Sequence, residues 1–211
     1  MLEGKFVVFD FETTGVGKDS KNNYKAYSHG ERPLPRENFP VELAATLIVD
    51  GIVARTYHTF IRGAERLDPW VLENCPHLSV KDCERDGVPF LEALRALADM
   101  AGPDHGECTL VAHNIQYDWS DVIVRTVNEL DASTDDAYRA LSTCKRFCTC
   151  VNPTTKASGR AYFYKKIGKW IGPKLKDLAS SLGVAYDDAS AHDATYDVDV
   201  TVQCLLRQSA R

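Results

Sequence analysis

Short apolar runs bounded by turn residues alternate along the chain with longer segments of helical spacing. Residues 5–11 form a nearly continuous apolar run, which is typical of a strand buried on both faces. Residues 41–49 and 52–61 are β-rich and joined by Asp50-Gly51, a strong hairpin signal. We expect an antiparallel pair after the first strand. Further strands are predicted over 108–112 and, more briefly, 142–144.

Helical spacing dominates most of the remaining chain. Asp68-Pro69 resembles an N-cap followed by proline at the first helical position. Helices with one apolar face are predicted over 88–100, 119–130, 175–182 and 193–206. This order predicts an α/β fold in which a mixed five-stranded sheet is flanked by helices, as one domain over residues 1–211. Residues 17–40 are polar and contain Pro33, Pro35 and Pro40, so we expect an irregular loop insertion there.

Composition agrees with an ordinary globular domain. The 211 residues are 44% apolar and 26% charged, which excludes disordered, collagen-like and coiled-coil chains. Seven scattered cysteines indicate reduced thiols. The N-terminus does not resemble a secretory leader, and no apolar run is long enough to span a membrane. We predict an intracellular protein, cytoplasmic or nuclear and not secreted, with no membrane partner.

The charge is distributed unevenly. Residues 139–176 carry ten Lys or Arg and no acid, whereas the rest of the chain carries 15 basic against 30 acidic residues. Within this stretch, residues 160–170 interleave aromatic and cationic side chains, as expected of a surface that stacks bases and neutralises phosphates. Two plainer interpretations stay open. The stretch could be a solvated basic loop, or a hairpin packed on the core with Tyr162 or Tyr164 buried.

Candidate chemistry begins at the end of the first strand. Asp10 and Glu12 are two residues apart in an otherwise apolar run, so strand alternation directs both carboxylates to the same side. Two adjacent anions repel each other unless a cation or a proton holds them together, and hard oxygen ligands suit Mg²⁺ or Mn²⁺. The alternative is that one of them forms an ordinary salt bridge. Asp118 follows the strand over 108–112, and His192 and Asp197 frame the start of the last helix.

Three segments resemble, in order and spacing, the exonuclease motifs of the DnaQ-like DEDD superfamily, which includes the proofreading subunit of bacterial replicative polymerase, RNase T and oligoribonuclease. They are residues 9–15, 113–118 and 192–197, and the resemblance covers nearly the whole chain. It implies an RNase H-like fold in which Asp10, Glu12, Asp118 and Asp197 bind metal. It also implies the His-type subclass with His192 as general base, because the Tyr-type subclass needs a tyrosine where this chain has Asp193.

The resemblance further implies an activity. We expect a 3′–5′ exonuclease that hydrolyses single-stranded nucleic acid from a free 3′ end, with DNA slightly favoured, and releases nucleoside 5′-monophosphates using two Mg²⁺ or Mn²⁺ ions. A polymerase or another replication or repair protein is a possible partner, and the sequence does not indicate the oligomeric state. The predicted nucleic-acid contacts are Thr13, Thr14, Asn114, Tyr162, Tyr164, Lys165, Lys166 and Lys169. One segment, Cys75-Pro76-His77-Leu78-Ser79, departs from the family pattern.

Other functions stay open at this point. The same active site serves RNA as well as DNA, so an exoribonuclease of the same family is one alternative. A polymerase-accessory module that binds nucleic acid is a second. A third is a small zinc-binding interaction protein that uses Cys144, Cys148 and Cys150, although this spacing lacks the usual Cys-x-x-Cys pair.

Overall fold

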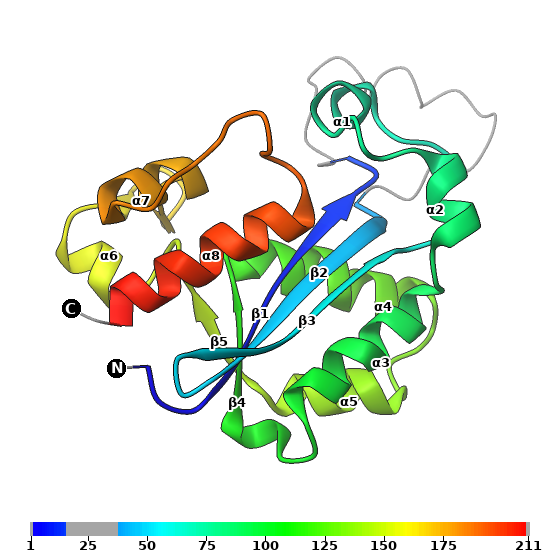
Figure 1. The fold of residues 1–211 in the computed structure, drawn as a ribbon, viewed down its shortest axis with the longest axis horizontal. Coiled ribbons are helices and arrows are strands. Elements are labelled where there is room, and N and C mark those ends of the chain that lie inside the picture. The colour runs from blue at the N-terminus through cyan, green and yellow to red at the C-terminus, as the bar shows by residue number, and fades with distance from the viewer. Residues whose placement is uncertain (1, 16–37, 210–211) are drawn as a thin grey trace.

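Five strands form the central sheet, in the order β3-β2-β1-β4-β5 (Figure 1). The computed structural model describes residues 2–15 and 38–209, so nearly all of the predicted loop insertion over 17–40 lies outside the described residues. β1 pairs antiparallel with β2 and parallel with β4; β2–β3 is antiparallel and β4–β5 is parallel. The mixed five-stranded α/β fold is therefore confirmed. The strands are Lys5–Thr13 (β1), Pro40–Val49 (β2), Ile52–Phe60 (β3), Cys108–Ala112 (β4) and Lys145–Cys148 (β5).

The predicted hairpin turn lies between β2 and β3. Asp50 and Gly51 both have positive φ, 50° and 80°. This is the backbone of a turn whose twist matches the two flanking strands, and it explains why Asp-Gly is favoured there.

The helices cover both faces of the sheet. Odd-numbered β1 residues such as Val7 and Phe9 belong to a core shared with α3 and the helices after β4, whereas Val8 belongs to a second core formed with α8. Figure 1 shows α8 crossing the sheet with α7 beside it. The helices are Pro69–Asn74 (α1), Val80–Asp86 (α2), Phe90–Ala101 (α3), His105–Glu107 (η1, a 3₁₀-helix), Tyr117–Val124 (η2, π-helical), Arg125–Glu129 (α4), Asp136–Thr143 (α5), Pro153–Ala157 (α6), Leu175–Leu182 (α7) and Ala194–Ser209 (α8).

The predicted strand over 142–144 is wrong. Residues 142 and 143 end α5, and the fifth strand begins only at Lys145. The helix forms because the Asp135 side chain accepts hydrogen bonds from the first free N–H groups, those of Ala137 and Tyr138, and because Ala137 and Leu141 share its buried face. The helix α2 was also not expected, although its Ser79 N-cap is a recognisable sequence signal.

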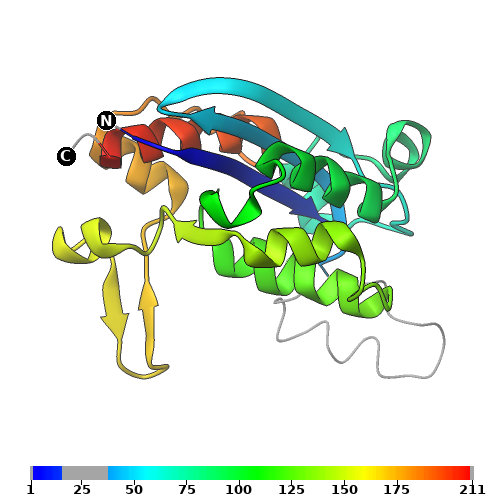
Figure 2. The ribbon, with the colours of Figure 1, turned by 90° about the horizontal axis from the view of Figure 1, so that it is seen from below.

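A separate hairpin projects from the molecule. β6 (Tyr162–Tyr164) pairs with β7 (Lys169–Ile171) as a two-stranded sheet of its own. Figure 2 shows this ribbon, in yellow and orange, standing away from the five-stranded sheet. No helix in the described ranges has the length and apolar content needed to cross a membrane.

Candidate active site

Strand β1 brings the first two carboxylates to the face of the sheet that α8 covers. Val8 packs with α8, and strand alternation places Asp10 and Glu12 on the same face, further along β1. The β1–β2 register shifts between Glu12 and Thr13. Such irregularities bend a strand locally and are common beside active sites.

Asp118 reaches the end of β1 from beyond β4. β4 pairs only with Lys5–Val8 of β1, so the edge of β1 after residue 8 is open to the chain that leaves β4. That chain turns at Asn114, with φ of 71°, and enters η2. Asp118, 2% exposed, accepts the Phe11 N–H at 3.2 Å through Oδ1. π-helical turns are rare and occur frequently at functional sites.

His192 and Asp197 approach from the start of α8. His192 lies just before the helix in a left-handed conformation, with φ of 66°, and its N–H donates to Asp197 Oδ2 at 3.3 Å. The other oxygen, Asp197 Oδ1, is buried and has no hydrogen-bond partner among the residues that the structure describes. The potential ligand atoms of Glu12, His192 and Asp197 lie within 4.8 Å of one another.

Mutual repulsion and burial set the electrostatics of this cluster. Burial raises the pKa of Asp10 well above its usual value, and the charges of Asp118, Glu12 and Asp197 raise it further. Burial and the neighbouring carboxylates act on Glu12 in the same direction. Burial also raises the pKa of Asp118 to about 7 and that of Asp197 to about 6. The four carboxylates therefore converge at one end of β1. The described part of the protein supplies too little positive charge there to offset their mutual repulsion.

These residues fit a divalent cation. The donors are carboxylate oxygens, which suit Mg²⁺ or Mn²⁺ and not a metal that prefers thiolates, and the imidazole of His192 lies beside them. Asp197 Oδ1 has no hydrogen-bond partner among the described residues, and the pKa values of the carboxylates are raised. Both features are expected where a bound cation completes the site. The metal-capable group found in the described residues contains none of Cys144, Cys148 or Cys150.

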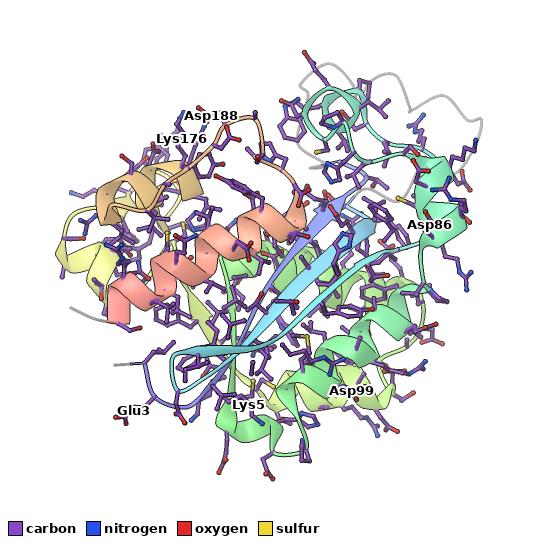
Figure 3. All side chains as sticks on the ribbon, in the orientation of Figure 1. Glu3, Lys5, Asp86, Asp99, Lys176 and Asp188 are labelled. Carbon is purple, nitrogen blue, oxygen red and sulfur yellow. The ribbon has the colours of Figure 1, made fainter. Side chains whose placement is uncertain are left out.

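The ring of His192 contacts an exposed tryptophan. Burial lowers the pKa of His192, and the charge of Lys174 lowers it further, so its imidazole is neutral at neutral pH and can accept a proton. Trp70 of α1, 42% exposed, meets this ring edge to face with centroids 5.0 Å apart. Sequence reasoning missed Trp70, because its proximity to His192 depends on how α1 packs above β1. Lys176 and Asp188, 2.6 Å apart, join α7 to the segment that leads to His192 (Figure 3).

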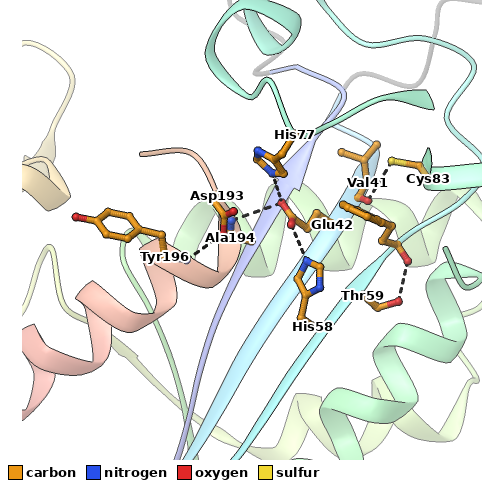
Figure 4. A network of polar contacts seen from close by, with 10 residues as sticks. Val41, Glu42, His58, Thr59, His77, Cys83, Asp193, Ala194 and Tyr196 are labelled. Carbon is orange, nitrogen blue, oxygen red and sulfur yellow. Dashed lines mark hydrogen bonds and ion pairs between the residues drawn. The ribbon is translucent and has the colours of Figure 1, made fainter. Parts of the chain in front are cut away.

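Glu42 is a fifth carboxylate near the site that sequence reasoning did not assign to it, and it is buried. It lies opposite Glu12 in the β1–β2 register and is bonded to His58 and His77 (Figure 4). Burial acts to raise the pKa of Glu42, but the hydrogen bonds from the two histidines outweigh it and lower the pKa. The same bonds raise the pKa of His58 and His77. The available signal was an acid within the apolar run of residues 40–49.

The predicted nucleic-acid contacts near the motifs differ in accessibility. Asn114 is exposed, whereas Thr13 and Thr14 are only 4% and 7% exposed. The Thr13 hydroxyl bonds to Tyr117 Oη at 2.9 Å, and the Thr14 hydroxyl accepts the Phe39 N–H at 3.2 Å. Contact between either hydroxyl and nucleic acid would have to compete with these bonds.

His113 supports the neighbouring loops. Its ring contacts the Thr149 hydroxyl at 3.0 Å and the Pro173 carbonyl at 3.1 Å, and burial lowers its pKa to about 4. The neutral ring therefore donates to the carbonyl and accepts from the hydroxyl. This ties the end of β4 to the chain that follows β7.

The hairpin exposes the predicted aromatic and basic residues. Tyr162 and Tyr164 are 57% and 43% exposed, so neither is buried in the core. Phe163 and Trp170 meet across the two strands, and the Lys156 ammonium lies 4.8 Å from the Trp170 ring centroid. We call Lys165, Lys166 and Lys169, all exposed, the hairpin lysines.

The sequence of residues 7–205 matches the RNase T exonuclease family. The chain belongs to this family. The exonuclease chain is also 24% identical over 209 residues to a DNA polymerase III of the PolC type from Mycoplasmopsis pulmonis, covering 99% of this chain but 12% of that protein. The identification as a DnaQ-like exonuclease domain is thereby confirmed.

Solved exonuclease structures share the fold. Apo Exonuclease I matches with a TM-score of 0.65 at 15% identity, covering 100% of this chain and 43% of the other. A zinc-bound E. coli Exonuclease I in complex with single-stranded DNA gives 0.66 at 15% identity, covering 99% and 41%. Exonuclease I from Methylocaldum szegediense gives 0.63 at 16% identity, covering 99% and 41%. This exonuclease chain thus spans about two fifths of these solved chains.

Proposed function

We propose that this chain is a divalent-metal-dependent 3′–5′ exonuclease of the His type, acting on single-stranded nucleic acid with a slight preference for DNA. The observation that carries the proposal is the convergence of Asp10, Glu12, Asp118 and Asp197 at one end of β1, with His192 beside them. A cluster of buried and partly buried acids with raised pKa values is costly without a ligand and is a mark of a functional site.

The residues of the chain have distinct roles in this reaction. The four carboxylates would hold two Mg²⁺ or Mn²⁺ ions, which lower the pKa of an attacking water and neutralise charge on the scissile phosphate. His192, whose pKa is lowered, accepts the proton of that water. The imidazole lies beside Glu12 and Asp197, with the Trp70 ring against it. Attack of the water on the terminal phosphate breaks its bond to the 3′ oxygen of the preceding nucleotide, so the last nucleotide leaves as a nucleoside 5′-monophosphate and the shortened strand ends in a 3′ hydroxyl.

The preference for a single strand follows from the depth of the site. Asp118 is almost fully buried, so the terminal phosphate approaches only when the last nucleotides have left a duplex, which costs a few kcal/mol when they are paired. DNA is favoured because the related proteins are a DNA polymerase and a nuclease solved with single-stranded DNA.

The hairpin is the proposed holding surface for the strand upstream of the 3′ end. Its exposed aromatic rings offer stacking faces, and the hairpin lysines offer charge to phosphates. Its base borders the active site, because Pro173 bonds to His113 and Lys174 acts electrostatically on His192. A nucleic-acid strand that leaves the site on this side would therefore meet residues 139–176, which contain ten basic residues and no acidic one.

The substrate is tested by competition. Equal amounts of single-stranded DNA, single-stranded RNA and blunt duplex DNA, each carrying a different 5′ label, are digested together in Mg²⁺ and again in Mn²⁺. We expect the single strands to shorten first, DNA slightly faster than RNA, with mononucleotides as products. Faster loss of RNA would assign the chain to RNA, and preferred attack on the duplex would contradict the single-strand proposal.

A polymerase partner is the second candidate role. It is favoured by one observation, namely that the PolC-type relative contains the matching segment within a much longer polymerase chain. In that case exonuclease activity would rise when the partner is added. Unchanged activity with a replicative polymerase would argue against it.

A further inference from the structure

Glu42 is a buried carboxylate beside the site to which the proposed reaction assigns no step. Its side chain is 1% exposed, and it faces Glu12 across the β1–β2 ladder. Burying a carboxylate costs several kcal/mol unless hydrogen bonds and opposite charge compensate. The partners that compensate Glu42 therefore indicate its role.

The three partners come from three different elements. Oε1 bonds to His58 Nε2 at 2.7 Å, and Oε2 bonds to His77 Nε2 at 3.0 Å. Oε2 also accepts the backbone N–H of Ala194 at 3.5 Å. His58 lies on β3, His77 in the turn before α2, and Ala194 at the start of α8. Figure 4 shows the Glu42 side chain at the centre of this network.

The contact to Ala194 acts on the part of α8 that matters for the site. Ala194 lies between His192 and Asp197 in the chain. The first N–H groups of a helix have no partner within the helix and need external acceptors. Asp193 accepts one of them, from Tyr196 at 3.1 Å, and Glu42 accepts another from the sheet side. Later turns of α8 dock on the sheet by apolar packing, through Val198 and Val202.

We propose that Glu42, held in place by His58 and His77, is a positioning residue that fixes the first turn of α8 against β1. The inference rests on the proposed function and deepens it, because this turn carries His192 and Asp197 to Glu12. Apolar packing keeps α8 docked when Glu42 is changed, but the first turn loses its tie to the sheet. A displacement of about 1 Å at reacting groups can cost about 10²-fold in rate.

The first test is Glu42→Gln, which keeps the size of the side chain, removes its charge and leaves one acceptor oxygen for three donors, those of His58, His77 and Ala194. We expect kcat on a single-stranded oligonucleotide to fall about 10- to 100-fold, while KM changes little and the folded fraction is unchanged by circular dichroism. The affinity for Mn²⁺, followed by the electron paramagnetic resonance of free Mn²⁺, should also fall. The matched control is Glu84→Gln, since Glu84 is an exposed glutamate that accepts a backbone N–H, from Gly63 at 2.6 Å. It should leave kcat, KM, the folded fraction and the affinity for Mn²⁺ unchanged.

A measurement without metal or substrate separates positioning from catalysis. In ¹⁵N–¹H spectra of the metal-free protein, the Ala194 amide should shift and exchange faster with solvent in Glu42→Gln, but not in Glu84→Gln. An unchanged amide together with wild-type kcat would overturn the proposal. So would a loss of activity that only follows a loss of folded protein. If the wild type shows no exonuclease activity, the proposed function fails, while the amide and Mn²⁺ data still decide the role of Glu42.

The half-exposed histidines provide a second route if Glu42→Gln does not fold. His58→Gln and His77→Gln each retain a donor for Glu42, whereas the corresponding Leu variants do not. We expect the Gln variants to keep most of the rate and the Leu variants to lose it, with the same shift of the Ala194 amide. Leu variants equal to wild type in both rate and amide shift would overturn the proposal.

Discussion

Replacing Asp118 by Asn should stabilise the metal-free protein at neutral and alkaline pH. Burial raises the pKa of Asp118 from 3.8 to about 7, a shift of about three units at about 1.4 kcal/mol each, so ionised Asp118 costs the fold at most about 4 kcal/mol. Because neighbouring carboxylates share their protons, we expect roughly half of this to be recovered. Asn is the informative change, since its Oδ1 still accepts the Phe11 N–H.

The sign of the pH dependence follows from the raised pKa. Below the unfolded-state value of about 3.9 both states are protonated and the carboxyl costs nothing, whereas above about 7 the full cost applies. The advantage of Asp118→Asn should therefore be largest at pH 8 and shrink towards pH 5. For a chain of this length 1 kcal/mol corresponds to about 2–4 °C in Tm, so a rise of about 4–8 °C is expected at pH 8.

The assay is thermal unfolding in chelator and again in Mg²⁺, at both pH values. Mg²⁺ should stabilise the wild type through binding to the folded state and stabilise Asp118→Asn less. Asp121→Asn is the matched control, because Asp121 lies in the same helix and is exposed. An Asp118→Asn protein that is no more stable than wild type at pH 8 in chelator, with the control unchanged, would refute the electrostatic reasoning.

Three further predictions concern the proposed reaction. His192→Ala should lose about 10²–10⁴-fold in kcat and lose the acidic limb of the pH–rate profile, and an unaltered limb would exclude it as the base. Trp70→Ala should lower kcat about 2- to 10-fold, because it removes an aromatic contact to the His192 ring worth about 0.5–1.5 kcal/mol. Steady-state kinetics would show whether the loss is specific, with Leu72→Ala as the control, since Leu72 is another exposed residue of α1. Changing all hairpin lysines to Ala should weaken binding of every single-stranded sequence and reduce the slope of log K against log salt by about 2, while kcat stays the same. Equal slopes for variant and wild type in a fluorescence-anisotropy titration would mean that the hairpin is only a solvated surface.

The part of the site that follows from local pattern could be predicted from the sequence. Asp10 and Glu12 are two residues apart in one strand, so strand geometry predicted that their carboxylates share a face, and the resemblance to the family supplied the set of four ligands that includes Asp118. The Asp50-Gly51 turn and the helix over 175–182, which ends at Gly183 with φ of 70°, were predicted for the same reason. Each depends on backbone preferences within a few residues.

What the sequence could not supply depends on contacts between distant segments. Glu42 joins the site only through the β1–β2 register, and Trp70 only through the packing of α1. The strand predicted over 142–144 failed because an N-cap at Asp135 and a buried face at Leu141 extend α5 through those residues. The π-helical form of η2, which carries Asp118, has no reliable local signal.

The central claim is that these carboxylates form a metal-dependent 3′–5′ exonuclease site. Its most direct test is a time course with a 5′-labelled single-stranded DNA, wild type beside Asp10→Asn, in Mg²⁺ with and without excess EDTA. The account predicts a ladder of labelled products that shortens one nucleotide at a time in the wild type with Mg²⁺ alone, and intact substrate in the other three conditions. An undiminished ladder in EDTA or with Asp10→Asn, or release of the 5′ label as the first product, would contradict it.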